Sequence, residues 1–101
     1  MATPLELSTR ASADGIPVVT VAGEIDMSNA GRFRDALGLA AAAVDGGSFV
    51  VDLTGVEYLD SAGVHVLFAH ASRIRLIAGP LLEPVLTVSG LSGITSADEP
   101  Q

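Results

Sequence analysis

Residues 51–64 read Val-Asp-Leu-Thr-Gly-Val-Glu-Tyr-Leu-Asp-Ser-Ala-Gly-Val. The residues at 49–53 are mostly apolar and predict a strand that is buried on both faces. A loop is expected through residues 57–59. Asp60 or Ser61 can then cap a helix by accepting a backbone N–H group that has no partner within the helix. The stretch therefore predicts a strand, a loop and a helix that begins at the Asp60-Ser61 pair.

Two strands and a helix are predicted upstream of this unit. The alternation at 5–9 and the apolar run at 17–23 are typical of strands, and the turn signal Asp14-Gly15 between them favours a hairpin. Ser28 or Asn29 can cap the helix that follows, and Gly46-Gly47 ends it. Its apolar face recurs at helical spacing and consists of Phe33, Leu37, Ala40, Ala41 and Val44.

The downstream sequence continues to alternate between strands and helices. The helix after Ser61 is expected to bury Val64, Leu67, Phe68 and Ala71. Residues 74–78 predict a strand, 81–88 a helix, 92–96 a last strand and 97–101 a frayed tail. The order β-β-α-β-α-β-α-β predicts an α/β fold with a mostly parallel central sheet and an N-terminal hairpin. The length of 101 residues suits a single domain over 1–101.

Composition excludes several classes of function. The formal net charge is −7 with five basic residues, which leaves no basic stripe for a nucleic acid. No cysteine is present, so thiolate metal sites are excluded. His65 and His70 are poorly spaced for a metal, and we expect no metal and no cofactor. The start lacks the pattern of a signal peptide and no apolar run is long enough to span a bilayer, so we expect a cytoplasmic protein without membrane insertion.

Three segments carry a resemblance to a known family. Residues 51–64 resemble the signature of STAS domains, the family of bacterial anti-sigma factor antagonists. Gly23-Glu24-Ile25-Asp26 resembles the family's turn after the second strand, and Ser89-Gly90-Leu91 resembles a segment near its last common helix. The segments lie in the family's order and the resemblance covers nearly the whole chain, so the fold is expected to be STAS-like, with helices packed mainly on one face of the sheet.

The resemblance implies a partner-switching function rather than an enzyme. In such proteins the Ser or Thr after the Asp is phosphorylated by the anti-sigma factor, which is a serine kinase of the GHKL type, and only the unphosphorylated form binds that kinase and frees the sigma factor. This role maps onto Ser61. The implied partner-binding residues are Asp26, Asp60, Ser61, Ala62, Gly63 and Val64, and no residue is assigned a catalytic role.

The residues leave several alternatives open. Ser61 and Asp60 could be only helix caps, Asp26 could be a turn residue that bonds its own backbone, and Tyr58 is expected to pack rather than function. The domain could instead be a cytoplasmic subunit of a lipid or anion transporter, or a module that binds its partner constitutively without phosphorylation. Compared with typical members, the segment 71–74 lacks several residues, and members commonly add another helix near where this sequence stops. If that helix is absent, we expect a bare apolar face and a homodimer.

Overall fold

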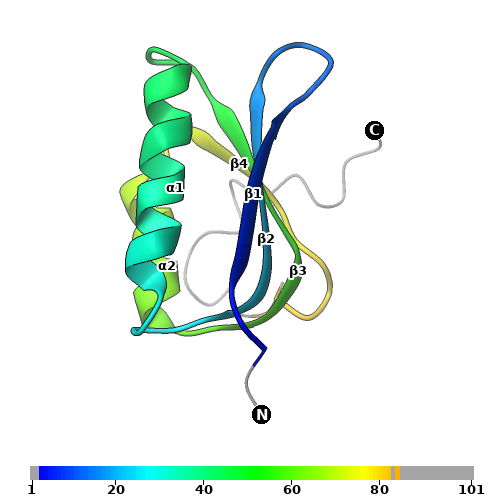
Figure 1. Cartoon of the computed structure of the whole chain (residues 1–101), viewed down its shortest axis with the longest axis vertical. Coiled ribbons are helices and arrows are strands. Elements are labelled where there is room, and N and C mark those ends of the chain that lie inside the picture. Colours follow the sequence, from blue (N-terminus) through cyan, green and yellow to red (C-terminus); the bar gives the residue numbers. More distant parts are fainter. Residues whose placement is uncertain (1–2, 83, 85–101) are drawn as a thin grey trace.

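The computed structural model describes residues 3–82 and 84, and within them the elements follow the order β-β-α-β-α-β (Figure 1). They are β1 (Glu6–Ala11), β2 (Pro17–Ile25), α1 (Ala30–Ala43), β3 (Phe49–Leu59), α2 (Ser61–Ala69) and β4 (Ile74–Ile77). The predicted order is therefore confirmed through β4. The helix predicted at 81–88 and the strand predicted at 92–96 lie almost entirely outside the described residues.

The described strands form one mixed sheet in the order β1-β2-β3-β4. β1 and β2 are an antiparallel hairpin, while β2 pairs with β3 and β3 with β4 in parallel. Both helices lie on the same face of this sheet (Figure 1). This arrangement agrees with the predicted hairpin, the mostly parallel sheet and the one-sided helices.

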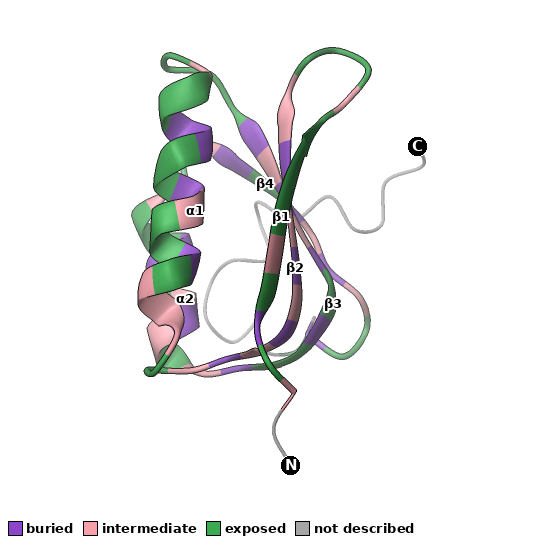
Figure 2. Ribbon diagram, viewed as in Figure 1, coloured by how far each residue is buried: buried purple, intermediate pink, exposed green. Residues whose placement is uncertain are grey.

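The core lies between the helices and the sheet, as the buried inner faces of α1 and α2 show (Figure 2). The predicted face of α1 is confirmed, because Phe33 and Leu37 are fully buried and the remaining members pack around them. The predicted face of α2 is partly wrong. Val66 and Leu67 are buried, whereas Phe68 is 47% exposed. The reason lies at the start of α2, where Gly63 lies close to the sheet. The helix face that contains residues 63, 66 and 67 therefore points to the core, and Phe68 lies outside this face.

The predicted loop at 57–59 is also wrong, because β3 continues as a strand to Leu59. Its ladder with β2 has register shifts between Thr20 and Ala22 and between Gly23 and Glu24. Such irregularities let a strand continue where its sequence does not alternate cleanly. Gly23 has φ +91°, and a Cβ there would lie 2.0 Å from the carbonyl oxygen of Pro4. The backbone at Pro4 can therefore pass this close to β2 only because residue 23 is a glycine.

The short connection between α2 and β4 is held by Arg73. Its guanidinium donates to the carbonyl oxygens of Ala41 at 2.8 Å and Gly47 at 3.1 Å, and its own carbonyl accepts from Phe49 N at 2.9 Å. A cation at the end of a helix satisfies carbonyls that lack helical partners and complements the helix dipole. Arg73 thus joins the end of α1 to the tight turn that follows α2.

Candidate functional site

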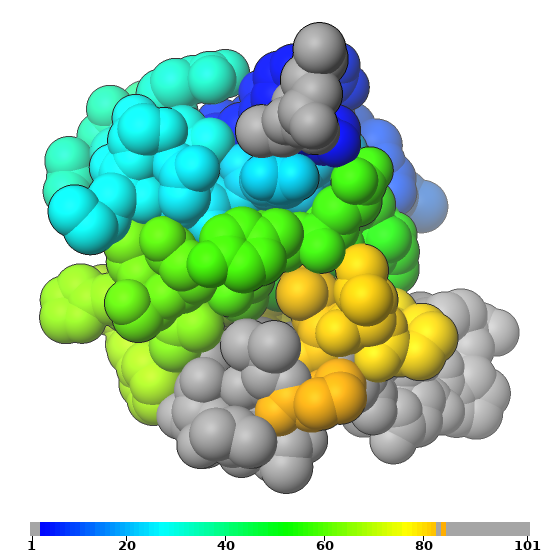
Figure 3. Space-filling view, turned by 90° about the horizontal axis from the view of Figure 1, so that it is seen from below, coloured from blue at the N-terminus to red at the C-terminus, as the bar shows by residue number. Residues whose placement is uncertain are grey.

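The predicted site residues gather where β2 and β3 end. Ile25 and Leu59 are partners in the parallel ladder, so Asp26 and Asp60 follow neighbouring strand ends. The backbone N–H of Asp60 donates to the carbonyl oxygen of Ile25 at 3.1 Å and ties the two ends together. Figure 3 looks at this end of the molecule, where the cyan segment after β2 lies against the green segment after β3. Asp26 and Asp60 thus follow paired residues at the same end of the sheet, and the ends of parallel strands are where α/β sheets commonly place binding surfaces.

Asp60 is the N-cap of α2. Its Oδ1 accepts from the backbone N–H groups of Ala62 at 2.9 Å and Gly63 at 3.3 Å, and its carbonyl accepts from Val64 N at 3.1 Å. The half-buried carboxylate therefore satisfies helix N–H groups that would otherwise lack a partner. Of the two candidate caps, the structure selects Asp60.

Ser61 is consequently the first residue of α2 rather than its cap. Its side chain is exposed, and its hydroxyl has no hydrogen-bond partner within the described part of the chain. The neighbouring carboxylate already holds the N–H groups that a serine cap would use. The hydroxyl of Ser61 is therefore presented to solvent on a fixed backbone.

Gly63 is buried in the first turn of α2 and lets this helix lie close to the sheet. A Cβ at this position would lie 2.3 Å from Leu59 Cδ1 and 2.8 Å from Ile25 Cγ2. Both contacts come from the strands that carry the site. Gly63 therefore sets the height of the helix over the strand ends, and Val64, which is half-buried, packs against the core beside it.

Asp26 is held by the turn that leads into α1. Its Oδ1 accepts from Ser28 N at 2.8 Å and from Ser28 Oγ, and these hydrogen bonds lower the pKa of the Asp26 carboxyl below its ordinary value. The interpretation of Asp26 as a turn residue that bonds its own chain is confirmed. Its position directly after β2 also puts this half-buried carboxylate at the same end of the sheet as Asp60 and Ser61.

Neither Ser28 nor Asn29 caps α1 with its side chain, contrary to the sequence prediction. Asn29 occupies the N-cap position without a side-chain cap hydrogen bond. Its amide instead accepts from Asp26 N at 2.9 Å and donates to the carbonyl oxygen of Glu24 at 2.9 Å. Asn29 thus fixes the end of β2 on which Asp26 is carried.

Two apolar side chains at this end of the molecule were not predicted as site residues. Met27 is 84% exposed in the turn after β2, and Tyr58 is 51% exposed at the end of β3. The expectation that Tyr58 packs is wrong, because the next residue, Leu59, takes the buried position and successive residues of a strand face opposite sides. Once β3 is extended to Leu59, this alternation would have identified Tyr58 from the sequence.

Within residues 3–82 and 84, no three His, Asp or Glu side chains lie where they could hold a metal ion. The same residues contain no helix that is both long and apolar enough to cross a membrane.

Comparisons with known proteins place the chain in one family. A family model described as "Mlab, STAS domain" matches residues 8–96. The anti-sigma-F factor antagonist RsfB of Mycobacterium tuberculosis is 35% identical over 66 residues, which is 65% of this chain, and the chain spans about half (53%) of the length of this curated relative.

Solved structures agree with this placement. A crystal structure of an anti-sigma factor antagonist from Mycobacterium paratuberculosis is 30% identical with a TM-score of 0.79, and the match covers 95% of this chain and 88% of that one. The unphosphorylated form of the antagonist SpoIIAA, at 22% identity, shares the fold with a TM-score of 0.62 over 93% of this chain and 85% of that one. The chain therefore belongs to the STAS domain family of anti-sigma factor antagonists, whose members are regulators rather than enzymes.

Proposed function

We propose that the unphosphorylated chain binds an anti-sigma factor, which is a serine kinase of the GHKL type, and so releases a sigma factor in the cytoplasm. Phosphorylation of Ser61 by that kinase ends the binding. One observation carries this proposal: the Ser61 hydroxyl is exposed and unbonded within the described residues, at a helix start that Asp60 caps, and at the sheet end that also carries Asp26.

The geometry supports Ser61 as a phosphate acceptor that need not disturb the fold. The hydroxyl makes no hydrogen bond that phosphorylation would break, and the added group would point to solvent. Asp60 already accepts from the N–H groups at the start of α2, so a phosphate would have to compete with it for them. The phosphate would therefore remain on the surface instead of being absorbed by the helix terminus.

The expected effect of phosphorylation is electrostatic. A phosphate adds a charge of about −1.5 to −2 at neutral pH. Asp26 and Asp60 lie at the adjacent strand ends, so the surface around Ser61 would change from moderately to strongly acidic. Desolvating such a group at an interface without a matching cation costs a few kcal/mol, and each ~1.4 kcal/mol is a tenfold loss of affinity.

The surface around Ser61 also supports a partner of defined chemistry. Met27 and Tyr58 offer exposed apolar area at the same end of the sheet as the two carboxylates. Aromatic and Met side chains are enriched at the centres of protein interfaces. We therefore expect the anti-sigma factor to present an apolar pocket with basic residues at its rim.

The test is incubation with ATP and the candidate anti-sigma kinases of the host, followed by intact mass, site mapping and measurement of complex formation. We expect one phosphate on Ser61, none in Ser61→Ala, and a complex only before modification. Ser48→Ala is the matched control, because Ser48 is also exposed but lies in the loop before β3. It should behave like the unmodified sequence.

Two other results would contradict the proposal. A stable kinase complex without phosphorylation would establish a constitutive partner-binding module. Neither phosphate nor complex would reject the antagonist function for this chain and favour a cytoplasmic subunit of a lipid or anion transporter, which a pull-down of the transporter ATPase would show.

A further inference from the structure

The outer edge of β1 is open. Within the described residues β1 is an end strand of the sheet and pairs only with β2. Five of its six residues are exposed, and Figure 2 shows the strand as exposed along most of its length. The strand contains no proline, lysine or bulge, which are devices that natural proteins use to protect a sheet edge. Its outward backbone groups are thus available to another strand.

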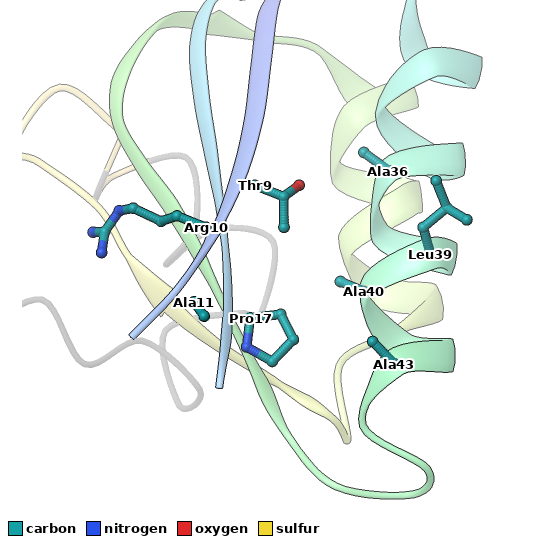
Figure 4. Close-up of a pocket in the computed structure, with 8 residues that line it drawn as sticks. All are labelled: Thr9, Arg10, Ala11, Pro17, Ala36, Leu39, Ala40 and Ala43. Atoms are coloured by element: carbon teal, nitrogen blue, oxygen red, sulfur yellow. The ribbon is translucent and has the colours of Figure 1, made fainter. Parts of the chain in front are cut away.

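An apolar groove runs beside this edge. It has a volume of about 460 Å³ and lies between β1 and α1 (Figure 4). On the helix side, residues at helical spacing along α1 line the groove. Their side chains are small except for that of Leu39, which is 75% exposed. The helical residues that line the groove are Ala36, Leu39, Ala40 and Ala43. The groove and the open strand edge form one continuous surface.

We propose that a second copy of this chain covers that surface. The two β1 strands would pair antiparallel about a two-fold axis perpendicular to the sheet, with Ser8 of each copy opposite Ser8 of the other. The two sheets would become one continuous sheet, and both edges would be removed by a self-complementary contact.

Charge complementarity selects both the occupant and the register. Residues that lie opposite each other in paired strands point to the same face of the sheet. The two-fold axis must therefore pass midway between one residue of β1 and the same residue of the other copy. With Ser8 at the centre, Glu6 of each copy lies opposite Arg10 of the other, and the strand forms two ion pairs with itself. Centring on Leu7 or Thr9 shifts the register by two positions and forms neither pair. The side chains of Glu6 and Arg10 have no hydrogen bond or ion pair within the described residues of one copy.

The helix face fits the same arrangement. Thr9 points toward α1 while Arg10 points away from it, so the ion pairs and the helices lie on opposite sides of the joined sheet (Figure 4). Helix α1 packs on β2 and reaches β1. Neighbouring strands are about 4.8 Å apart, so the two β2 strands would lie three spacings, or about 14 Å, from each other across the axis. The two α1 helices would therefore stand on the same face of the joined sheet with the two grooves, which Leu39 helps to line, between them.

The dimer would leave the Ser61 surface free. Because the two copies run antiparallel, their β2 and β3 strands end at opposite ends of the joined sheet. Each dimer would therefore bind two anti-sigma factors that do not meet. Dimerisation and partner binding are then independent, and each can fail without the other.

The test combines a cross-link with a charge exchange. The chain has no cysteine, so Ser8→Cys introduces a single thiol. Directly opposite residues of antiparallel strands have Cα atoms about 4.5–5.5 Å apart, which is within disulfide range. We expect mild oxidation to give a disulfide-linked dimer of Ser8→Cys at low protein concentration. The matched control Ser48→Cys, at an exposed site away from β1, should remain largely uncross-linked.

Sedimentation equilibrium provides the second measurement. Glu6→Arg places like charges opposite each other twice, so we expect its dimer dissociation constant to rise at least about tenfold. Arg10→Glu should do the same, and the double exchange Glu6→Arg with Arg10→Glu should restore the dimer. A strictly monomeric chain at high concentration would overturn the proposal. So would a dimer that all three charge variants leave unchanged, or equal cross-linking of both cysteine variants.

Discussion

Gly63→Ala tests whether the packing of α2 on the strand ends sets the site. The new Cβ would lie 2.3 Å from Leu59 Cδ1, the flexible end of a side chain, and 2.8 Å from Ile25 Cγ2, part of a stiff branched residue. Overpacking of a buried site costs about 1–3 kcal/mol. The gain in helix propensity from Gly to Ala is about 1 kcal/mol. We therefore expect a net loss of stability of about 1 kcal/mol.

Gly38→Ala in α1 is the matched control. It makes the same exchange in a helix, but apart from its chain neighbours and the nearby helix backbone no atom of the described residues lies within 4 Å of the Cβ that it adds. We expect it to stabilise the domain by about 1 kcal/mol. Urea unfolding followed by circular dichroism should separate the two variants by about 2 kcal/mol at equal m-values. In thermal melts about 1 kcal/mol corresponds to roughly 4–8 °C for a domain of this size. If Gly63→Ala were as stable as Gly38→Ala, the packing argument would be refuted.

Three further predictions follow from the hydrogen bonds of the site and the connections. Asp60→Ala should cost about 1 kcal/mol in urea unfolding, while Asp60→Asn keeps most of the cap; equal losses would contradict the cap assignment. The pKa of the Asp26 carboxyl is lowered, so the hydrogen bonds of its ionised form stabilise the fold fully at pH values above the ordinary pKa of 3.8. This stabilisation is lost as the pH falls through the lowered pKa. An NMR titration should show this pKa rise in Ser28→Ala; an unchanged value would reject the role of Ser28. Arg73→Lys should lower the free energy of unfolding by about 1 kcal/mol, because an ammonium lacks the planar fork with which Arg73 reaches the carbonyl oxygens of both Ala41 and Gly47. An unchanged free energy in urea unfolding would exclude this role for the guanidinium.

The open β1 edge and the Ser61 surface have different consequences for the molecule. The Ser61 surface lies at the ends of the parallel strands, where hydrogen bonds from Asp60 and Asn29 hold the backbone. The β1 edge lies at the side of the sheet and is exposed along nearly its full length. The two surfaces can therefore serve different contacts in one small domain.

Local patterns predicted the elements because helices and hairpins depend on neighbours in sequence. The apolar spacing from Phe33 to Val44 identified α1 and its buried face. The pair Asp60-Ser61 located the start of α2, since a capping side chain acts within three residues. The three segments that resemble the family's motifs predicted the membership that the comparisons confirm.

Only the tertiary structure decided what depends on residues distant in sequence. The extension of β3 to Leu59 requires the irregular ladder with β2, and it is this extension that exposes Tyr58. The contact of Gly63 with both strand ends turns Phe68 outward. Asp26 and Asp60 are 34 residues apart in sequence and lie at the same end of the sheet because the parallel strands β2 and β3 end side by side. The sequence by itself thus determined the order of the elements and the position of Ser61, whereas non-local pairing and packing decided which side chains surround it.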